Sequence, residues 1–391
     1  MNVGSPFIAV VKREWRRMTS RRIYFVASVL LPLFSIFFMG TIFGTGQMEN
    51  LPIGIVDEDN SAMSREIVRY VEADPTLKVI KHYCDDKTAL EDVRRKNIYG
   101  YLYIPISFED KVMDGKPVSL NYYYHYAMMS VGAEIQGAFQ TLMGIVSADP
   151  IVTEALALGI QENVITSFLL PVSSMDYPLF NPDMDYSIYL TQPFFFVFLQ
   201  ILLLLIVTYA IGSEGKFHTS REWLETANNN IFIAVTGKLF IYVVIFMVMG
   251  ILSNYVYFGV LNIPLECGFM PINLVTVLFI ISTASLGVFL FSLFPALSII
   301  ISIVSLVGSL GATLSGVTFP VTSMYPIVRE FTYILPIRHF VEIAHTLLYG
   351  NYGFAYYWQN IIILLAFVVP ALLLLPHLKR ALISGRYDNI E

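Results

Sequence analysis

The chain has 391 residues, of which 56% are hydrophobic and only 14% are charged, whereas soluble domains carry about 25% charged residues. The net charge of −6, without any basic stripe, gives no basis for nucleic-acid binding. Cys84 and Cys267 lie far apart and outside metal-ligand spacing, so neither a disulfide framework nor a zinc site is indicated. Composition therefore favours an integral membrane protein over a soluble globule.

Basic residues dominate both ends of the chain. Segment 1–22 is expected to be an amphipathic cytoplasmic segment, and segment 378–391 a cytoplasmic tail that carries Lys379, Arg380 and Arg386. Because basic flanks stay on the cytoplasmic side, both termini are predicted to be cytoplasmic in a bacterial inner membrane. The basic residues before the first span are Lys12, Arg13, Arg16, Arg17, Arg21 and Arg22, against the single acid Glu14.

Six apolar stretches are long enough to cross a bilayer, which requires about 20 residues. The first exceeds the apolar run of a signal peptide, and no small-residue cleavage site follows it, so we expect an uncleaved anchor. The fold class is predicted to be a multi-pass α-helical membrane protein with an α/β extracytoplasmic domain. The spans are expected at 23–43, 188–212, 239–259, 271–293, 297–318 and 356–377.

The segment 44–187 separates the first two predicted spans and is expected to lie outside the cell. It is acidic, with 21 acidic and 10 basic residues over 44–185. Apolar alternation and turn residues predict an α/β domain with helical arms. Strands are expected at 52–56, 77–83, 99–104 and 118–124, helices at 61–73 and 88–96, and helical arms at 127–170, with Asp149-Pro150 as the one strong breaker.

Two groups of residues leave alternative interpretations open. The tyrosine-rich run 122–126 could form a binding platform, although aromatic residues are also good strand formers. His339, Glu342 and His345 share a helical face and could hold a metal, yet their spacing is not that of H-E-x-x-H. Polar contacts at the outer membrane interface are the alternative, and we predict no metal.

The chain lacks the phosphate-binding loop of an ATPase, since Gly237-Lys238 has neither the upstream glycine nor the following Ser or Thr. We therefore expect no enzymatic activity and no cofactor on this chain. Any ATP and magnesium would be bound by a separate subunit.

The segment 213–238 lies between two predicted spans and places Trp223 and Leu224 among alternating charges, which is typical of an amphipathic element on a membrane surface or a partner. The segment resembles the coupling region of type 2 ABC exporter permeases. The resemblance departs at His218, Arg221 and Ala227. It assigns contact with the ATPase to Glu214, Thr219, Glu222, Trp223, Leu224, Thr226, Gly237 and Lys238.

A second match to this family follows the fifth predicted span. The segment 319–355 is too polar to span and is expected to form short helices or a re-entrant hairpin on the outer side. Tyr325 is inserted into the Met-Pro pair of the family. The resemblance assigns an outer gate to Ser315, Gly316, Phe319, Pro320, Met324, Pro326, Pro336 and Gly350.

The resemblance implies a permease subunit that pairs with a second permease, as a homodimer or heterodimer, and docks a cytoplasmic ABC ATPase. Because few charges lie in the predicted spans, we expect efflux of a hydrophobic or amphiphilic substrate, with a periplasmic adaptor as a possible further partner. The alternatives are a membrane-anchored receptor or infection-type protein that binds through its outer domain, and a membrane enzyme built on His339, Glu342 and His345.

Overall fold

The computed structural model describes residues 5–44, 46–157, 181, 185–350 and 353–384. The chain forms two compact units, one of residues 1–46 and 178–391 and the other of residues 47–177. Six helical stretches in the first unit are long and apolar enough to cross a membrane, counted over the described residues. The second unit contains a four-stranded sheet. The predicted fold class, a six-span helical membrane protein with an α/β domain, is therefore confirmed.

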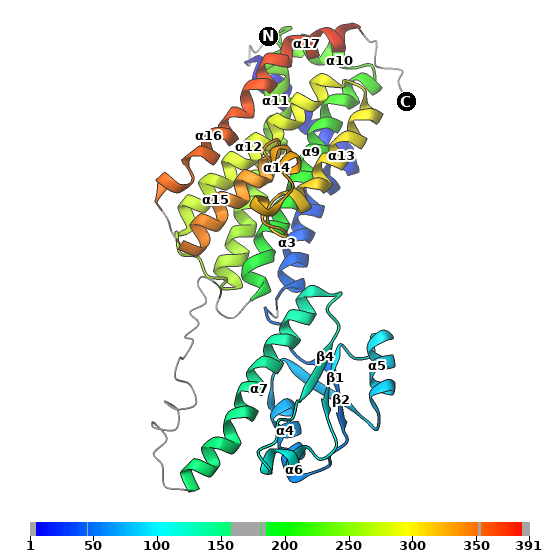
Figure 1. Cartoon of the computed structure of the whole chain (residues 1–391). Helices are drawn as coiled ribbons and strands as arrows, with labels where there is room; N and C mark the ends of the chain where they lie inside the picture. The colour runs from blue at the N-terminus through cyan, green and yellow to red at the C-terminus, as the bar shows by residue number, and fades with distance from the viewer. Residues whose placement is uncertain (1–4, 45, 158–180, 182–184, 351–352, 385–391) are drawn as a thin grey trace. The chain divides into compact units, whose positions relative to one another are not determined.

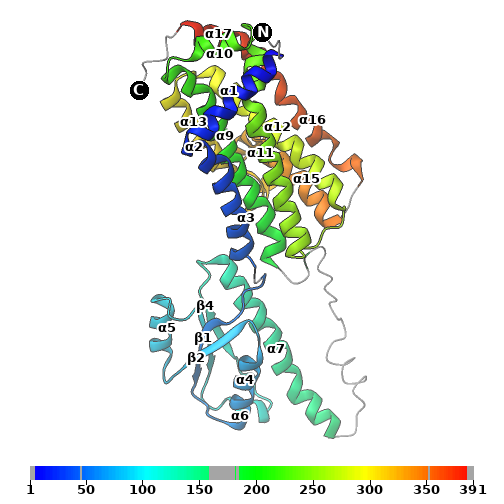
Figure 2. The ribbon, with the colours of Figure 1, turned by 180° about the vertical axis from the view of Figure 1, so that it is seen from behind.

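The first unit begins with the amphipathic helix α1 (Pro6–Ser20), which ends where Arg21 adopts an extended conformation. The first span follows at once over Arg22–Ile42. Figure 2 shows α1 crossing the end of the helical unit near α10 (Ser220–Thr226) and α17 (Val368–Ser384). The remaining spanning stretches are Ser187–Lys216 with α9 (Gln192–Lys216), Ile231–Val260 with α11 (Ile231–Asn254), α12 (Phe269–Leu293), α13 (Leu297–Leu314) and Trp358–Ser384 with α16 (Trp358–Ala366) and α17 (Val368–Ser384).

Several spanning helices extend beyond the predicted apolar stretches. Helix α9 continues to Lys216, and α11 begins at Ile231, where the Asn230 side chain accepts hydrogen bonds from the amides of Phe232 and Ile233. Helix α17 passes through Pro376 to Ser384. A helix ends where capping and packing end it, whereas hydropathy marks only the part that suits lipid. The 213–238 segment is therefore mostly helical.

The segment after α13 forms short helices that include α14 (Pro326–Thr332), followed by the longer amphipathic helix α15 (Pro336–Gly350). Figure 1 places α15 beside α12 and α16, which it contacts. Phe340 packs between Phe196 and Phe279, with ring centroids 4.3 and 4.8 Å apart. The buried Gln200 side chain of α9 accepts a hydrogen bond from the Ile337 amide at the start of α15.

The second unit contains a sheet with the strand order β2-β1-β3-β4, in which only β4 runs antiparallel to its neighbour. Helices α4 and α7 cover one face, and α5 covers part of the other. The long helix α7 passes through Asp149-Pro150 without a break, and residues 158–170 of the expected arms lie outside the described residues. The elements are β1 (Leu51–Asp57), α4 (Ala62–Ala73), β2 (Leu77–Tyr83), α5 (Asp86–Arg94), β3 (Gly100–Ile104), α6 (Phe108–Met113), β4 (Asn121–Tyr124) and α7 (Met129–Ala157).

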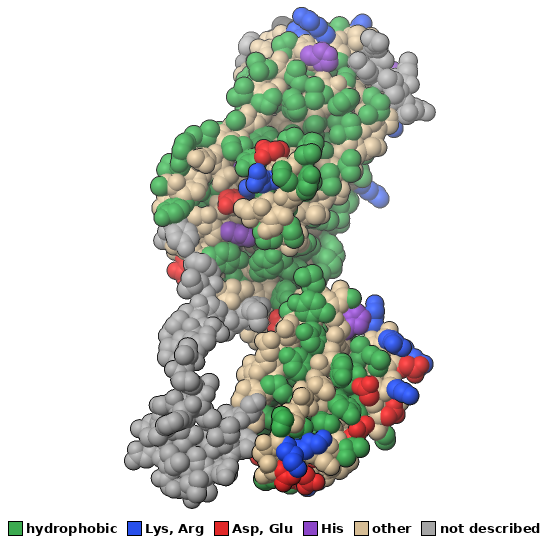
Figure 3. All heavy atoms as spheres, in the orientation of Figure 1, with side chains coloured by type: hydrophobic (Ala, Val, Ile, Leu, Met, Phe, Trp, Pro, Cys, Tyr) green, Lys and Arg blue, Asp and Glu red, His purple; other side chains and the backbone are tan. Residues whose placement is uncertain are grey.

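The tyrosine-rich run 122–126 belongs mainly to β4 and its following turn. Tyr122 stacks on Phe139 of α7, and Tyr123 stacks on Tyr101 of β3, with centroids 5.2 and 4.9 Å apart. Ring stacking on both faces of the sheet therefore stabilises the edge strand β4. Figure 3 shows charged side chains clustered on this unit, whereas hydrophobic side chains cover most of the visible helical unit.

Candidate functional site

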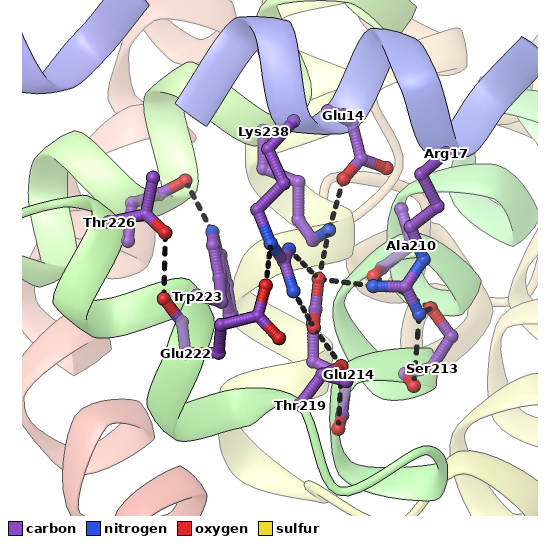
Figure 4. A network of polar contacts seen from close by, with 12 residues as sticks. Glu14, Arg17, Ala210, Ser213, Glu214, Thr219, Glu222, Trp223, Thr226 and Lys238 are labelled. Carbon is purple, nitrogen blue, oxygen red and sulfur yellow. Dashed lines mark hydrogen bonds and ion pairs between the residues drawn. The ribbon is translucent and has the colours of Figure 1, made fainter. Parts of the chain in front are cut away.

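A group of buried charges joins α1 to α9 and α11, the two helices that begin and end the 213–238 segment (Figure 4). Its centre is Glu214, in the last turn of α9, whose side chain is fully buried. Charges buried in this way are tolerated only when they are paired and hydrogen-bonded. We call the group the Glu214 cluster, and its charged members are Arg13, Glu14, Arg17, Glu214 and Lys238.

The Glu214 carboxylate receives hydrogen bonds from two other helices, α1 and α11, and from Thr219 in the turn that follows α9. Arg13 of α1 binds it with both terminal guanidinium nitrogens, at 2.6 and 3.0 Å. Arg17 of α1 donates to the same carboxylate, and Lys238 of α11 donates at 2.6 Å. The Thr219 hydroxyl donates as well. A two-pronged guanidinium–carboxylate contact fixes orientation as well as distance, so Glu214 holds the end of α9 against α1 and α11.

A second buried carboxylate extends the cluster. Glu14 of α1 accepts hydrogen bonds from the Lys238 ammonium and, at 2.7 Å, from the Tyr242 hydroxyl. Lys238 therefore bridges the two carboxylates, and it lies 5.0 Å from the ring centroid of Trp223. Three cations face two buried carboxylates, and the largely exposed Glu222 adds a third acid through its hydrogen bond to Arg13. The three cations are thus balanced only when the exposed Glu222 is counted with the two buried carboxylates.

The electrostatic environment favours the ionised guanidinium groups of α1. Burial acts against the charged form of Arg13 and Arg17, but the adjacent Glu214 carboxylate outweighs it and raises the pKa of both. Arg17 also donates to the backbone oxygen and hydroxyl of Ser213, at 3.2 and 3.1 Å. All of these contacts tie α1 to the last turn of α9.

The turn between α9 and α10 (Ser220–Thr226) has a defined capping geometry. His218 has φ +54°, its amide binds the Gly215 carbonyl, and the Thr219 amide binds the Glu214 carbonyl. These two hydrogen bonds form a Schellman motif, in which glycine usually occupies the left-handed position. The family pattern has glycine where this chain has His218, so the departure keeps the turn and adds the steric cost of a side chain.

The structure separates the predicted coupling residues into a buried and an exposed set. Glu214, Trp223, Leu224, Gly237 and Lys238 are buried, whereas Glu222 is exposed and Thr219 and Thr226 are partly exposed. The Trp223 indole donates to the Ala234 carbonyl at 3.2 Å, which anchors α10 to α11. A Cβ atom at Gly237 would lie 3.0 Å from the Val10 side chain, so glycine permits the close approach of α1.

In the sequence, Arg13, Glu14 and Arg17 indicate only the orientation of the chain in the membrane, and no pattern singles out Tyr242. A usable signal was present in α1, because Val10, Glu14 and Met18 are four residues apart and share one face. An acid placed between two apolar residues on one face of a basic helix indicates a buried partner. The position of that partner, Lys238, which lies 224 residues later in the chain, is not encoded by local spacing.

The predicted outer-gate residues lie along one connection but do not form one cluster. Gly316, with φ +92°, turns the chain after α13, beside the buried Ser315. Pro326 and Pro336 begin α14 and α15, and Gly350 is the last residue of α15. Phe319 is 49% exposed, and Pro320 is exposed while Met324 is partly exposed. Most of these residues define where helices begin and end.

His339, Glu342 and His345 make separate contacts. The two ring nitrogens of His339 lie 2.8 Å from the Asn360 side-chain oxygen and 3.1 Å from the Tyr333 carbonyl. Glu342 pairs with Arg338 at 2.9 Å, and His345 packs against the Tyr349 ring. These contacts favour the structural interpretation of all three residues.

Comparison with known proteins identifies the family. Residues 22–375 match the model of the ABC-2 family transporter protein. The chain belongs to the ABC-2 transporter family. The inner membrane transport permease YhhJ of Escherichia coli K12 is 24% identical over 340 residues, which cover 82% of this chain and 83% of YhhJ, and YhhJ of Shigella flexneri matches equally. No solved structure matches.

Membership in the ABC-2 family confirms the resemblance found in the sequence. The matched region contains the first five spanning stretches and most of the sixth, and it includes α9, α10 and α11. The chain is therefore a multi-pass permease component of a transporter. Within this permease, the Glu214 cluster is the most densely charged buried site among the described residues.

Proposed function

We propose that this ABC-2 permease exports a hydrophobic or amphiphilic substrate, driven by ATP that a separate cytoplasmic ATPase hydrolyses. The supporting observation is the rigid connection between α10 and the spanning helices. Trp223 binds α10 to α11, and the Glu214 cluster binds the end of α9 to α1 and α11. A force applied to α10 would therefore reach three helices together.

The ATPase would contact the exposed side of this region. Behind that side, Trp223 and Leu224 are 0% and 1% exposed, so they support α10 and are not available to a partner. Lys379 of α17 also donates to the Asn229 carbonyl at 2.6 Å, which holds the turn after α10. We call the exposed side the α10 ridge, and it comprises Lys216, Phe217, His218, Arg221, Glu222, Glu225 and Asn228.

A charge exchange on the α10 ridge tests the docking proposal. We expect Arg221→Glu combined with Glu225→Arg to reduce ATPase copurification by about tenfold or more, because reversed charges oppose a complementary surface. The tagged permease is purified in mild detergent, and the Walker-motif ATPase in the eluate is quantified by mass spectrometry. Trp223→Ala is a poorer probe, because it removes the support of α10 as well.

The matched control exchanges a similar pair elsewhere. Glu91 of α5 and Arg95, the C-cap of that helix, are also four residues apart and mostly exposed, so Glu91→Arg with Arg95→Glu changes charge equally. This control should retain the ATPase. Full retention of the ATPase by the α10 ridge variant, or the absence of any ATPase from the unmodified permease, would refute the proposed docking.

The remaining features of the proposal come from the family and from composition. Two permease subunits would pair, ATP and magnesium would be bound by the ATPases, and a periplasmic adaptor could contact the α/β unit. An apolar substrate agrees with a cavity of about 290 Å³ in the helical unit, which is lined by Leu286, Phe289, Ile334, Ile363, Ala366, Phe367 and Pro370. Family membership favours a permease over the receptor alternative.

The proposal requires α10 inside the cell and the α/β unit outside, in the bacterial inner membrane. Cys84 is exposed in the α/β unit and offers a natural probe. In intact cells, we expect a membrane-impermeant maleimide to label Cys84 when Cys267 is replaced by serine. Arg221→Cys, with both native cysteines replaced by serine, should be labelled only after permeabilisation. The opposite pattern of labelling would reverse the topology.

A further inference from the structure

Helix α1 has two opposite faces, of which the Glu214 cluster uses only one. Val10, Glu14 and Met18 are buried on the inner face. Ile8 and Trp15 on the other face are 48% and 54% exposed. Residues 8, 12 and 15 follow a spacing of four and three, so Lys12 lies on the same exposed face between Ile8 and Trp15.

The apolar surface continues from α1 into the first span. Ile23 and Phe25, just past the extended Arg21, are 54% and 53% exposed. Helix α1 is therefore joined to a lipid-facing helix without a linker. Tryptophan is enriched where a membrane meets water, because its ring is apolar and its N–H is polar. Trp15 is thus positioned at the boundary of the bilayer.

Three cations surround this surface without compensation. Lys12, Arg16 and Arg22 are exposed, and among the described residues their side chains make no ion pair or hydrogen bond. The only acid in α1 is Glu14, which is buried and bound to Lys238 and Tyr242. The outer face of α1, with Lys12 and Arg16, and the start of the first span, with Arg22, therefore present positive charge around an apolar centre.

We propose that the outer face of α1 binds the headgroups of anionic phospholipids. Trp15 and Ile8 enter the region of the upper acyl chains, while Lys12, Arg16 and Arg22 contact the phosphates. Each cation near an anionic surface favours binding roughly fivefold. A zwitterionic headgroup attracts these cations less, because it carries an ammonium beside its phosphate. The proposal does not depend on ATPase docking, because it concerns the opposite face of α1 from the Glu214 cluster.

Tryptophan quenching by brominated lipid tests this directly. The protein has three tryptophans, of which Trp223 is fully buried and Trp358 is 42% exposed. In the full-length Trp358→Phe variant, Trp15 is therefore the exposed reporter. Two vesicle preparations of equal charge and equal bromine content contain phosphatidylcholine and phosphatidylglycerol, with bromine on the acyl chains of one lipid or of the other.

We expect brominated phosphatidylglycerol to quench Trp15 more strongly than brominated phosphatidylcholine. The difference should disappear when Lys12, Arg16 and Arg22 are all replaced by glutamine, and it should weaken in high salt because screening shortens the range of charge interactions. The control replaces three exposed cations of the α/β unit, Lys78, Lys87 and Arg94, by glutamine and should keep the difference.

Two results would overturn the proposal. Equal quenching by the two brominated lipids would show that the face contacts lipid without preference for charge. No quenching by either lipid would show that protein or water covers Trp15, as it would if a partner protein occupied this face. Loss of ATPase copurification alone would leave the proposal unaffected, so the two proposals fail separately.

Discussion

Replacing Glu214 by glutamine should destabilise the protein more than any other single neutralisation in the Glu214 cluster. The substitution leaves Arg13, Arg17 and Lys238 close together with Glu14 as their remaining buried carboxylate. Removing one partner of a buried ion pair typically costs about 3–5 kcal/mol, because the remaining charge stays out of water. We expect a lower melting temperature in detergent, faster proteolysis within α1 and loss of transport.

The control for this prediction is Glu222→Gln. Glu222 also binds Arg13, at 3.2 Å, but its side chain is 68% exposed. Exposed ion pairs contribute about 0–1 kcal/mol, so this variant should melt close to the unmodified protein. If Glu214→Gln melts as the control does, the cluster does not hold α1 in place and the mechanical connection to α10 loses its basis.

The second large effect concerns the pair Lys238 and Glu14, which can be tested by a double-mutant cycle. Lys238→Met alone should cost about 3–5 kcal/mol, because Glu14 then remains buried with only the Tyr242 hydroxyl as a described partner. Glu14→Gln removes that isolated charge and can still accept the Tyr242 hydrogen bond. The double variant should therefore be more stable than Lys238→Met alone.

The measurement is the melting of all four proteins under one detergent condition, with the coupling energy taken from the cycle. Directly paired residues usually show coupling of about 0.5–3 kcal/mol, and we expect the upper part of this range. If the two substitutions are additive within about 0.5 kcal/mol, the ion pair makes no net contribution. Lys238 would then act only through Glu214.

The burial of Trp223 changes how the proposed coupling element would work. An amphipathic pattern identifies an apolar face but does not say what covers it. From the sequence, either the membrane surface or a partner protein could cover the face that contains Trp223. In the structure, α11 covers it, since Trp223 donates to the Ala234 carbonyl. The charged residues of the α10 ridge, such as Arg221 and Glu225, are what remains for recognition by another subunit.

The departures from the family pattern can also be explained physically. His218 occupies the left-handed position of the Schellman motif, so His218→Gly should preserve the turn and relieve strain. The insertion of Tyr325 places that residue directly before Pro326, where it serves as the N-cap of α14. Both departures therefore lie at the ends of helices, His218 after α9 and Tyr325 before α14.

Hydropathy alone determined the number of spanning stretches and the existence of a separate α/β unit, because both depend on local runs of apolar or alternating residues. Spacing likewise identified β2 at 77–83 and the helix near 61–73. The ends of helices were harder to predict from the sequence, since α9 and α11 are extended by caps and by packing against α1. Local composition could not show where those contacts would form.

Only the tertiary structure decided which polar residues act together. Arg13 and Glu214 are 201 residues apart, and Glu14 and Tyr242 are 228 apart, so no local pattern joins them. Their contact follows from the packing of α1 along α11, which the small Gly237 permits. The sequence by itself determined that charges were present beside the membrane, and the packing of three helices determined that these charges pair with one another away from water.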